Sequence, residues 1–190
     1  MAVGPRDHSL IDALEALNTR SFEGRLWRVT RDERDPTLFF AGGNRWDDGT
    51  FEVLYTSLSR EGALAEMHYH AARGQPIVPS KIKYRLHELQ VRLDGVLDLT
   101  DKSVLVNLGI DSATYGKLPY LKREGEYEAC QKIGEAAHFL GSNDPDDPSA
   151  ILVPNARYDG ENMVIFGDYV SFEAIEHIKD HGIIDWSKIK

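Results

Sequence analysis

Residues 43–66 read GNRWDDGTFEVLYTSLSREGALAE and predict a turn, a strand and the start of a helix in succession. The glycine-bounded segment 43–49 is typical of a turn. Residues 51–58 are rich in aromatic and β-branched side chains, which favours a strand. Because side chains alternate along a strand, one face carries Phe51, Val53, Tyr55 and Ser57.

The helix that follows this strand has clear start and stop signals. Ser59 is a typical N-cap residue, Glu61 complements the helix dipole and Gly74 ends the pattern, so residues 60–73 are predicted to be helical. The apolar stripe of this helix consists of Ala63, Leu64, Met67 and Ala71. Glu66 lies at the edge of the stripe, where a carboxylate is half sheltered from water.

The rest of the chain alternates between the two kinds of element without a regular βαβ order. Strands are predicted over residues 25–30, 84–93, 96–99, 151–153 and 162–166, and helices over residues 9–17, 100–108, 126–140 and 171–181. Residues 109–125 form a long loop, a length that is often functional. This order predicts an α+β fold. We expect one domain over residues 1–190, with a core at about 25–167 and a helix at each end.

The composition excludes several classes of protein. The chain has a net charge of -9 and an isoelectric point near 5.2, which argues against a nucleic-acid partner. The longest apolar runs are far shorter than a membrane span, and the start of the chain lacks a signal-peptide pattern. With one cysteine, an internal disulfide and a multi-cysteine zinc site are excluded. We therefore expect a cytoplasmic protein without a membrane segment.

Common catalytic and metal-binding motifs are absent. The chain has no phosphate-binding G-x-x-x-x-G-K-[ST], no G-x-G-x-x-G and no G-x-S-x-G. His68 and His70 point about 200° apart on a helix, so surface histidines are favoured over a metal site. Cys130 lies among apolar neighbours in a helix, which favours a packed cysteine over a nucleophile.

The polar residues that remain each allow two interpretations. Arg28 is either a solvated arginine on the outer face of its strand, which local pattern favours, or a planar fork for an anionic ligand. Arg45, beside Trp46, has the same two interpretations. Tyr55 and Ser57 are either core residues or ligand contacts. Glu66 is more often a rim carboxylate than a catalyst.

Taken together and in order, these residues resemble a known family. The blocks are Arg28, GNRWDDG at 43–49, LYTS at 54–57, ALAE at 63–66, YRLH at 84–87, VLDLT at 96–100, CQKIGEAAHF at 130–139 and LVP at 152–154. This pattern is similar to the RES domain, a family of bacterial toxins named for an arginine, a glutamate and a serine. Family members commonly have serine after the last proline, and this chain has Asn155 there.

The resemblance implies an ADP-ribosyltransferase-like fold and a toxin that cleaves NAD between nicotinamide and ribose. NAD is then the substrate, with inorganic phosphate as an alternative acceptor to water, and no other cofactor or metal is expected. Glu66, Arg28 and Tyr55 are the implied catalytic residues. The implied substrate contacts are Arg28, Arg45, Trp46, Tyr55, Ser57, Gln131 and Asn155.

The same resemblance implies a protein partner. An Xre-like antitoxin would cover the active site, and a homodimer or a larger complex with the antitoxin stays open. Two other functions also stay open at this point. The chain could transfer ADP-ribose to a protein target, or it could be an inactive binding module.

Overall fold

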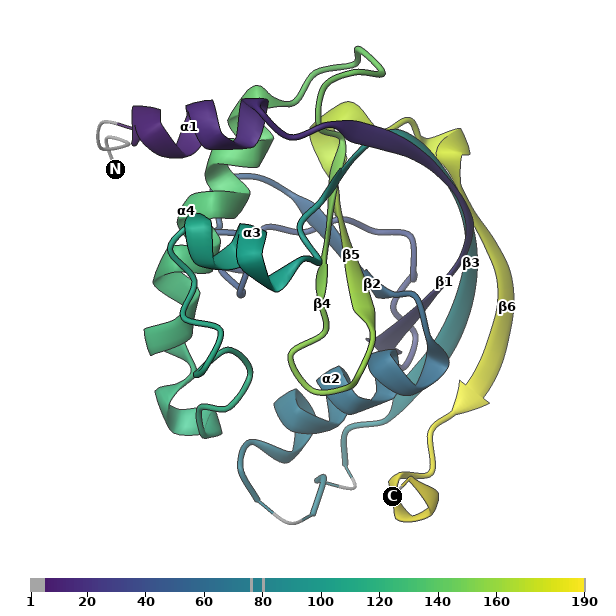
Figure 1. Cartoon of the computed structure of the whole chain (residues 1–190). Helices are drawn as coiled ribbons and strands as arrows, with labels where there is room; N and C mark the ends of the chain where they lie inside the picture. The colour runs from purple at the N-terminus through teal and green to yellow at the C-terminus, as the bar shows by residue number, and fades with distance from the viewer. Residues whose placement is uncertain (1–5, 76, 80, 190) are drawn as a thin grey trace.

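The computed structural model describes residues 6–75, 77–79 and 81–189, and its elements are shown in Figure 1. The helices are α1 His8–Glu15, α2 Arg60–Ala72, α3 Lys102–Asn107 and α4 Glu124–Leu140. The strands are β1 Thr19–Arg31, β2 Val53–Ser57, β3 Tyr84–Asp98, β4 Ala150–Pro154, β5 Glu161–Phe166 and β6 Ile175–Ile183. Strands and helices are mixed without βαβ repetition, so the predicted α+β class is confirmed.

The strands form one strongly curved sheet with the order β1-β2-β5-β4-β3-β6. Because β1 also pairs with β3, the first five strands of this order close into a ring, and β6 extends the outer edge of β3. The β1–β3 ribbon is the longest pairing, from Thr19 opposite Leu97 to Arg31 opposite Tyr84. The β3–β4 pair is parallel and the other pairs are antiparallel.

Three apolar clusters form the core, and two of them hold the helices against this sheet. One joins α1, α3 and α4 to β2, β4 and β5, and includes Ile133, Val153 and Phe166. A second fills the inside of the curved sheet around Leu26, Leu89 and Leu152. A third lies under α2, where Ala63 and Leu64 pack near Val29 and Leu86. Adjacent residues of β2 enter different clusters, so both faces of this strand are covered.

Helix α2 begins and ends close to its predicted bounds. Ser59 Oγ accepts a hydrogen bond from the Gly62 N–H at 3.0 Å, as expected of an N-cap. The residue after the helix, Arg73, has a φ of 52°, which is the left-handed conformation common at helix ends. The start and the end of this helix could therefore be predicted from its own capping residues.

The prediction of a last helix over residues 171–181 is wrong. Only Phe172–Ala174 form a single 3-10 turn, and Ile175–Ile183 form strand β6. Most side chains of β6 are exposed, so its sequence lacks the apolar alternation that marks a strand. Its backbone pairing with the distant strand β3 decides the structure instead.

The observed bounds of β1, β3 and α3 also differ from the predicted ones. Strand β1 begins at Thr19, six positions before its predicted start, because its first half is largely exposed and polar. The predicted strands 84–93 and 96–99 are one continuous strand, β3. Helix α3 is capped by Asp101 rather than Thr100.

Among the described residues, every helix is too short or too polar to serve as a membrane span.

Candidate active site

A pocket of about 340 Å³ opens between β1, β2, α2 and the two loops that precede β2 and α4. It is lined by six of the predicted residues: Arg28, Arg45, Trp46, Tyr55, Ser57 and Glu66. Among the described residues, the lining includes five arginines, at positions 28, 31, 34, 45 and 73, and a single carboxylate, Glu66. In a protein with a net charge of -9, this pocket is a local concentration of positive charge.

Arg28 is buried, with only 6% of its surface exposed, so the interpretation as a solvated surface arginine is wrong. Its Nη1 donates hydrogen bonds to the carbonyl oxygens of Pro36 at 2.7 Å and Leu38 at 3.0 Å. Burial, with a smaller effect of Arg34, lowers the pKa of Arg28 to about 10. The side chain is thus held in place by neutral groups while its charge stays available to a ligand.

Glu66 lies on the pocket face of α2 and is half buried. Its Oε1 accepts hydrogen bonds from the Ala156 N–H at 3.0 Å and from Asn162 Nδ2 at 3.2 Å. Both donors come from the β4–β5 hairpin, so helix and hairpin fix the carboxylate between them. Helix α2 can approach this hairpin closely because Gly62 has no Cβ, which would lie 2.9 Å from Asn155 Nδ2.

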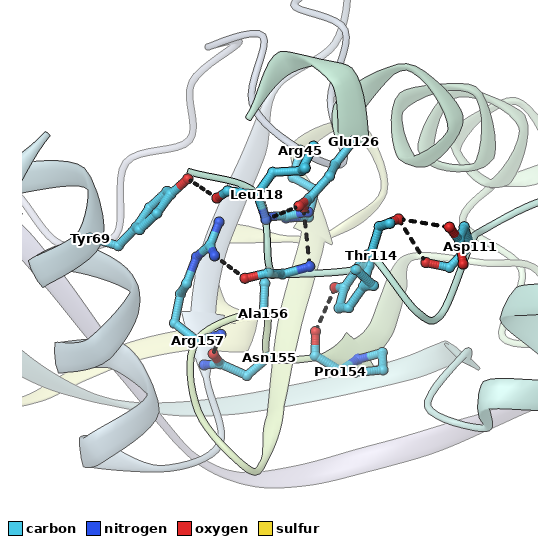
Figure 2. A network of polar contacts seen from close by, with 12 residues as sticks. Arg45, Tyr69, Asp111, Thr114, Leu118, Glu126, Pro154, Asn155, Ala156 and Arg157 are labelled. Atoms are coloured by element: carbon cyan, nitrogen blue, oxygen red, sulfur yellow. Dashed lines mark hydrogen bonds and ion pairs between the residues drawn. The ribbon is translucent and has the colours of Figure 1, made fainter. Parts of the chain in front are cut away.

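Arg45 is buried and its charge is already balanced within the protein. Figure 2 shows its ion pair with Glu126, whose carboxylate also accepts hydrogen bonds from the N–H groups of Gly116 at 3.1 Å and Leu118 at 2.8 Å. The Tyr115 and Tyr127 rings lie 5.1 Å from the guanidinium carbon. Burial raises the pKa of Glu126, but the hydrogen bonds and charge of Arg45 outweigh it, so the pKa is lowered overall.

The loop before α4, predicted over residues 109–125, becomes a wall of the pocket through Tyr115 and Tyr120. Tyr69 donates a hydrogen bond to the Leu118 carbonyl at 3.0 Å, and Arg157 donates to the Gly116 carbonyl (Figure 2). The Arg157 guanidinium stacks on the Tyr69 ring at 3.4 Å. Together with Glu126, these contacts attach the loop to both α2 and the β4–β5 hairpin.

Tyr55 supports the turn that carries Arg45 and Trp46. Its hydroxyl accepts a hydrogen bond from the Trp46 N–H at 2.8 Å and donates to Asp47 Oδ2 at 3.0 Å. Burial and the nearby Asp47 charge raise the pKa of Tyr55. Tyr55 therefore lines the pocket as a neutral phenol with its hydroxyl already used.

The sequence reasoning missed Asp47, which is fully buried. Its carboxylate accepts hydrogen bonds from the N–H groups of Gly42, Gly43 and Asn44 at 3.0, 2.6 and 3.0 Å. An aspartate within a glycine-rich turn was the available signal. Gln131 also belongs to this support, because its Nε2 donates to the Asn44 carbonyl at 2.8 Å. Gln131 does not line the pocket within the described part of the chain.

Asn155 also lies behind the pocket wall rather than in it. It is 7% exposed, and its Nδ2 donates to Asn162 Oδ1 at 2.9 Å. Ser57 donates to the same oxygen at 2.5 Å. Asn162, which the sequence reasoning also missed, lines the pocket and connects both residues to Glu66.

The remaining titratable candidates behave as structural residues. Burial raises the pKa of the Cys130 thiol to about 11, which disfavours the thiolate that a nucleophile requires. Burial and the nearby arginines lower the pKa of His70 to about 4, so this pocket residue is neutral at physiological pH. His68 contacts Trp186 with a ring separation of 5.6 Å. No cluster of metal-ligating side chains occurs among the residues described.

A comparison with solved structures identifies a protein with a similar fold. A solved structure described as "Crystal structure of the M.tuberculosis MbcT-MbcA toxin-antitoxin complex" is similar, with a TM-score of 0.73 and 24% identity. The match covers 94% of this chain and 93% of that one, and at this identity it shows a shared fold. No curated protein matched the chain.

The family comparison covers most of the chain. The model of the RES domain matches residues 25–187, from the middle of β1 to the residues that follow β6. This match spans more than half of the sequence and includes every residue of the pocket. The chain belongs to the RES domain family.

Proposed function

We propose that the protein is a toxin that cleaves NAD at the bond between nicotinamide and ribose. The observation that carries the proposal is the pocket composition: five arginines surround one half-buried carboxylate, and several aromatic rings complete the lining. Arginines bind the two negative charges of a pyrophosphate, and aromatic rings stack on the bases. This combination suits a dinucleotide better than a neutral metabolite.

The chemistry requires little beyond these groups. The nicotinamide ring of NAD is positively charged, and it becomes neutral when it leaves with the electron pair of the broken C–N bond. The ribose then carries an oxocarbenium charge, which a nearby carboxylate stabilises. We assign this role to Glu66. Water or inorganic phosphate then forms the new C–O bond, with release of a proton when water is the acceptor.

Among the arginines, the structure favours Arg28 over Arg45 for the pyrophosphate. The Arg45 charge is balanced by Glu126, whereas Arg28 makes hydrogen bonds to neutral carbonyls only, within the described residues. Arg31, Arg34 and Arg73 complete the positive lining. Trp27 and Tyr120 provide aromatic faces in the same pocket.

The decisive experiment is incubation of the purified protein with NAD, with and without inorganic phosphate, followed by analysis of the products. Release of nicotinamide in both conditions, with ADP-ribose as the second product, identifies a glycohydrolase. Release that requires phosphate, with a phosphorylated ADP-ribose, identifies a phosphorylase. Attachment of ADP-ribose to a protein would identify a transferase, and the absence of nicotinamide release would contradict the proposal.

Expression of the protein alone is expected to arrest bacterial growth, because loss of NAD stops redox metabolism. Glu66→Gln should relieve the arrest at the same level of folded protein. Growth curves and NAD measurements in cells that produce each form provide the test. Normal growth with the wild-type protein, in the absence of any partner, would count against the toxin role.

We further propose a protein partner, an Xre-like antitoxin, that covers the pocket. The support is that the similar solved structure is a toxin–antitoxin complex, together with family membership. The positive pocket offers a docking point for a partner carboxylate, since guanidinium groups bind carboxylates and phosphates with the same fork geometry. We expect the toxin to act in the cytoplasm, where the cell holds its NAD.

Arg28→Ala is expected to weaken NAD binding by about 10- to 100-fold, the range for loss of a charged hydrogen bond. Calorimetry should be done in the Glu66→Gln background so that NAD is not consumed. Arg28→Lys retains the charge but loses the planar fork, and should give an intermediate affinity. If a folded Arg28→Ala protein binds NAD as tightly as the wild type, Arg28 does not contribute to NAD binding.

A further inference from the structure

A chain of polar side chains crosses the sheet behind the pocket and ends on Glu66. Ser57 of β2 and Asn162 of β5 are opposite each other in the strand register. Ser57 Oγ and Asn155 Nδ2 both donate to Asn162 Oδ1, at 2.5 and 2.9 Å. Asn162 Nδ2 then donates to Glu66 Oε1 at 3.2 Å. The chain thus runs from two buried residues to the pocket carboxylate.

One backbone group determines which way each amide in this chain points. The Arg157 N–H can only donate, and it lies 2.8 Å from Asn155 Oδ1. The other end of the Asn155 side chain is therefore the Nδ2 donor, and it faces Asn162. Asn162 must turn its oxygen toward this donor, which leaves its own Nδ2 to face Glu66.

The consequence for Glu66 is a fixed and asymmetric carboxylate. Asn162 Nδ2 and the Ala156 N–H both bind Oε1, and no described residue donates to Oε2. The oxygen Oε2 is therefore the one available to a ligand.

We propose that Asn162 is a positioning residue for Glu66, and that Asn155 and Ser57 set its orientation. This inference rests on the proposed function, because it assigns Glu66 the working carboxylate. It also gives a physical role to the position where the RES family commonly has serine. A serine hydroxyl, like the Asn155 amide, has both an acceptor and a donor, which are the two functions that the Arg157 N–H and Asn162 require at this position.

The test compares Asn155→Asp with Asn155→Ser. Aspartate has no donor, so its second oxygen repels Asn162 Oδ1 and turns the Asn162 amide over. The amide oxygen then faces Glu66, so the carboxylate loses the Asn162 donor that holds it in place. Asn155 lies outside the pocket lining, whereas Asn162 and Glu66 belong to it, so the effect reaches a bound substrate through these two residues.

For Asn155→Asp we expect kcat to fall by about 10- to 100-fold, with KM nearly unchanged. Asn155→Ser should keep most of the wild-type kcat. Asn107→Asp, an equal charge change at an exposed position on α3, is the matched control and should change neither kcat nor KM.

Two results would overturn the inference. One is an equal loss of kcat in Asn155→Asp and Asn155→Ser, which indicates a purely structural role. The other is wild-type activity in Asn155→Asp. Nitrogen-15 NMR of labelled asparagine provides a readout that needs no turnover: the side-chain amide signals of Asn162 should shift in Asn155→Asp and stay near their wild-type positions in Asn155→Ser. If the wild type does not cleave NAD, the proposed function fails, while this NMR measurement still decides the inference.

Discussion

Glu66→Gln is expected to lower the turnover of NAD by about 10²–10³-fold, the range for removal of one group that stabilises transition-state charge. Glutamine keeps the shape of glutamate, and its oxygen can accept the same hydrogen bonds from Asn162 and Ala156. The substitution removes the negative charge that, in the proposed mechanism, stabilises the oxocarbenium cation. Since that charge matters only in the transition state, NAD affinity should change little.

The measurement combines single-turnover release of nicotinamide with calorimetry of NAD binding. Glu61→Gln is the matched control, because Glu61 lies on the same helix but is exposed and outside the pocket lining. Its turnover should equal that of the wild type. Glu66→Gln protein that is folded and as active as the control would exclude Glu66 as the catalytic carboxylate.

Glu126→Gln should destabilise the protein by about 3–5 kcal/mol, the usual result of breaking a buried ion pair from one side. Arg45 would keep its charge without a counter-charge. The carboxylate of Glu126 accepts hydrogen bonds from the N–H groups of Gly116 and Leu118. A glutamine would point its NH₂ group at one of these two N–H groups, so that two donors would face each other. We expect the loop that carries Tyr115 and Tyr120 to detach before the rest of the protein unfolds.

Urea denaturation measures the stability change, and hydrogen exchange of the residue 110–122 amides reports the loop. Glu128→Gln is the matched control on the same helix. Its carboxylate is 79% exposed and pairs with Lys132, so its loss should cost less than about 1 kcal/mol. A Glu126→Gln protein as stable as this control would show that the buried pair contributes little.

The pH dependence of stability follows from the same group. The pKa of Glu126 is lower in the folded protein than its ordinary value of 4.5, so the folded state favours the ionised form. Its contribution to stability is fully present above pH 4.5 and is lost as the pH falls through the folded-state pKa. The stability gap between wild type and Glu126→Gln should therefore narrow in acid.

Local chemistry explains which elements could be predicted from the sequence. The strand at β2 and the helix at α2 follow from alternation, a serine N-cap and a glycine stop, all within neighbouring residues. Strand β6 could not be predicted, because its exposed side chains give no pattern and its partner β3 lies about 90 positions earlier. The backbone hydrogen bonds between β3 and β6 join residues far apart in the sequence, so a pattern of neighbouring residues does not predict them.

The same distinction applies to the candidate site. Arg28, Tyr55 and Glu66 were selected from family-like blocks, and the structure places all three in one pocket, although their catalytic roles stay predictions. Asp47 and Asn162 were missed because their importance lies in contacts rather than in residue type. Arg45 was assigned to the ligand because Glu126, 81 positions later, gave no sign that it would balance the charge.

The long separation between Glu66 and its hydrogen-bond partner Asn162 has a consequence during synthesis. Asn162 lies 96 positions later in the chain. At about 5–20 residues per second, a ribosome takes roughly 5–20 s to proceed from one to the other. During that interval the nascent polypeptide holds its glutamate without the donors that orient it. The pocket carboxylate is therefore fixed in place only late in synthesis, after the β4–β5 hairpin has been made.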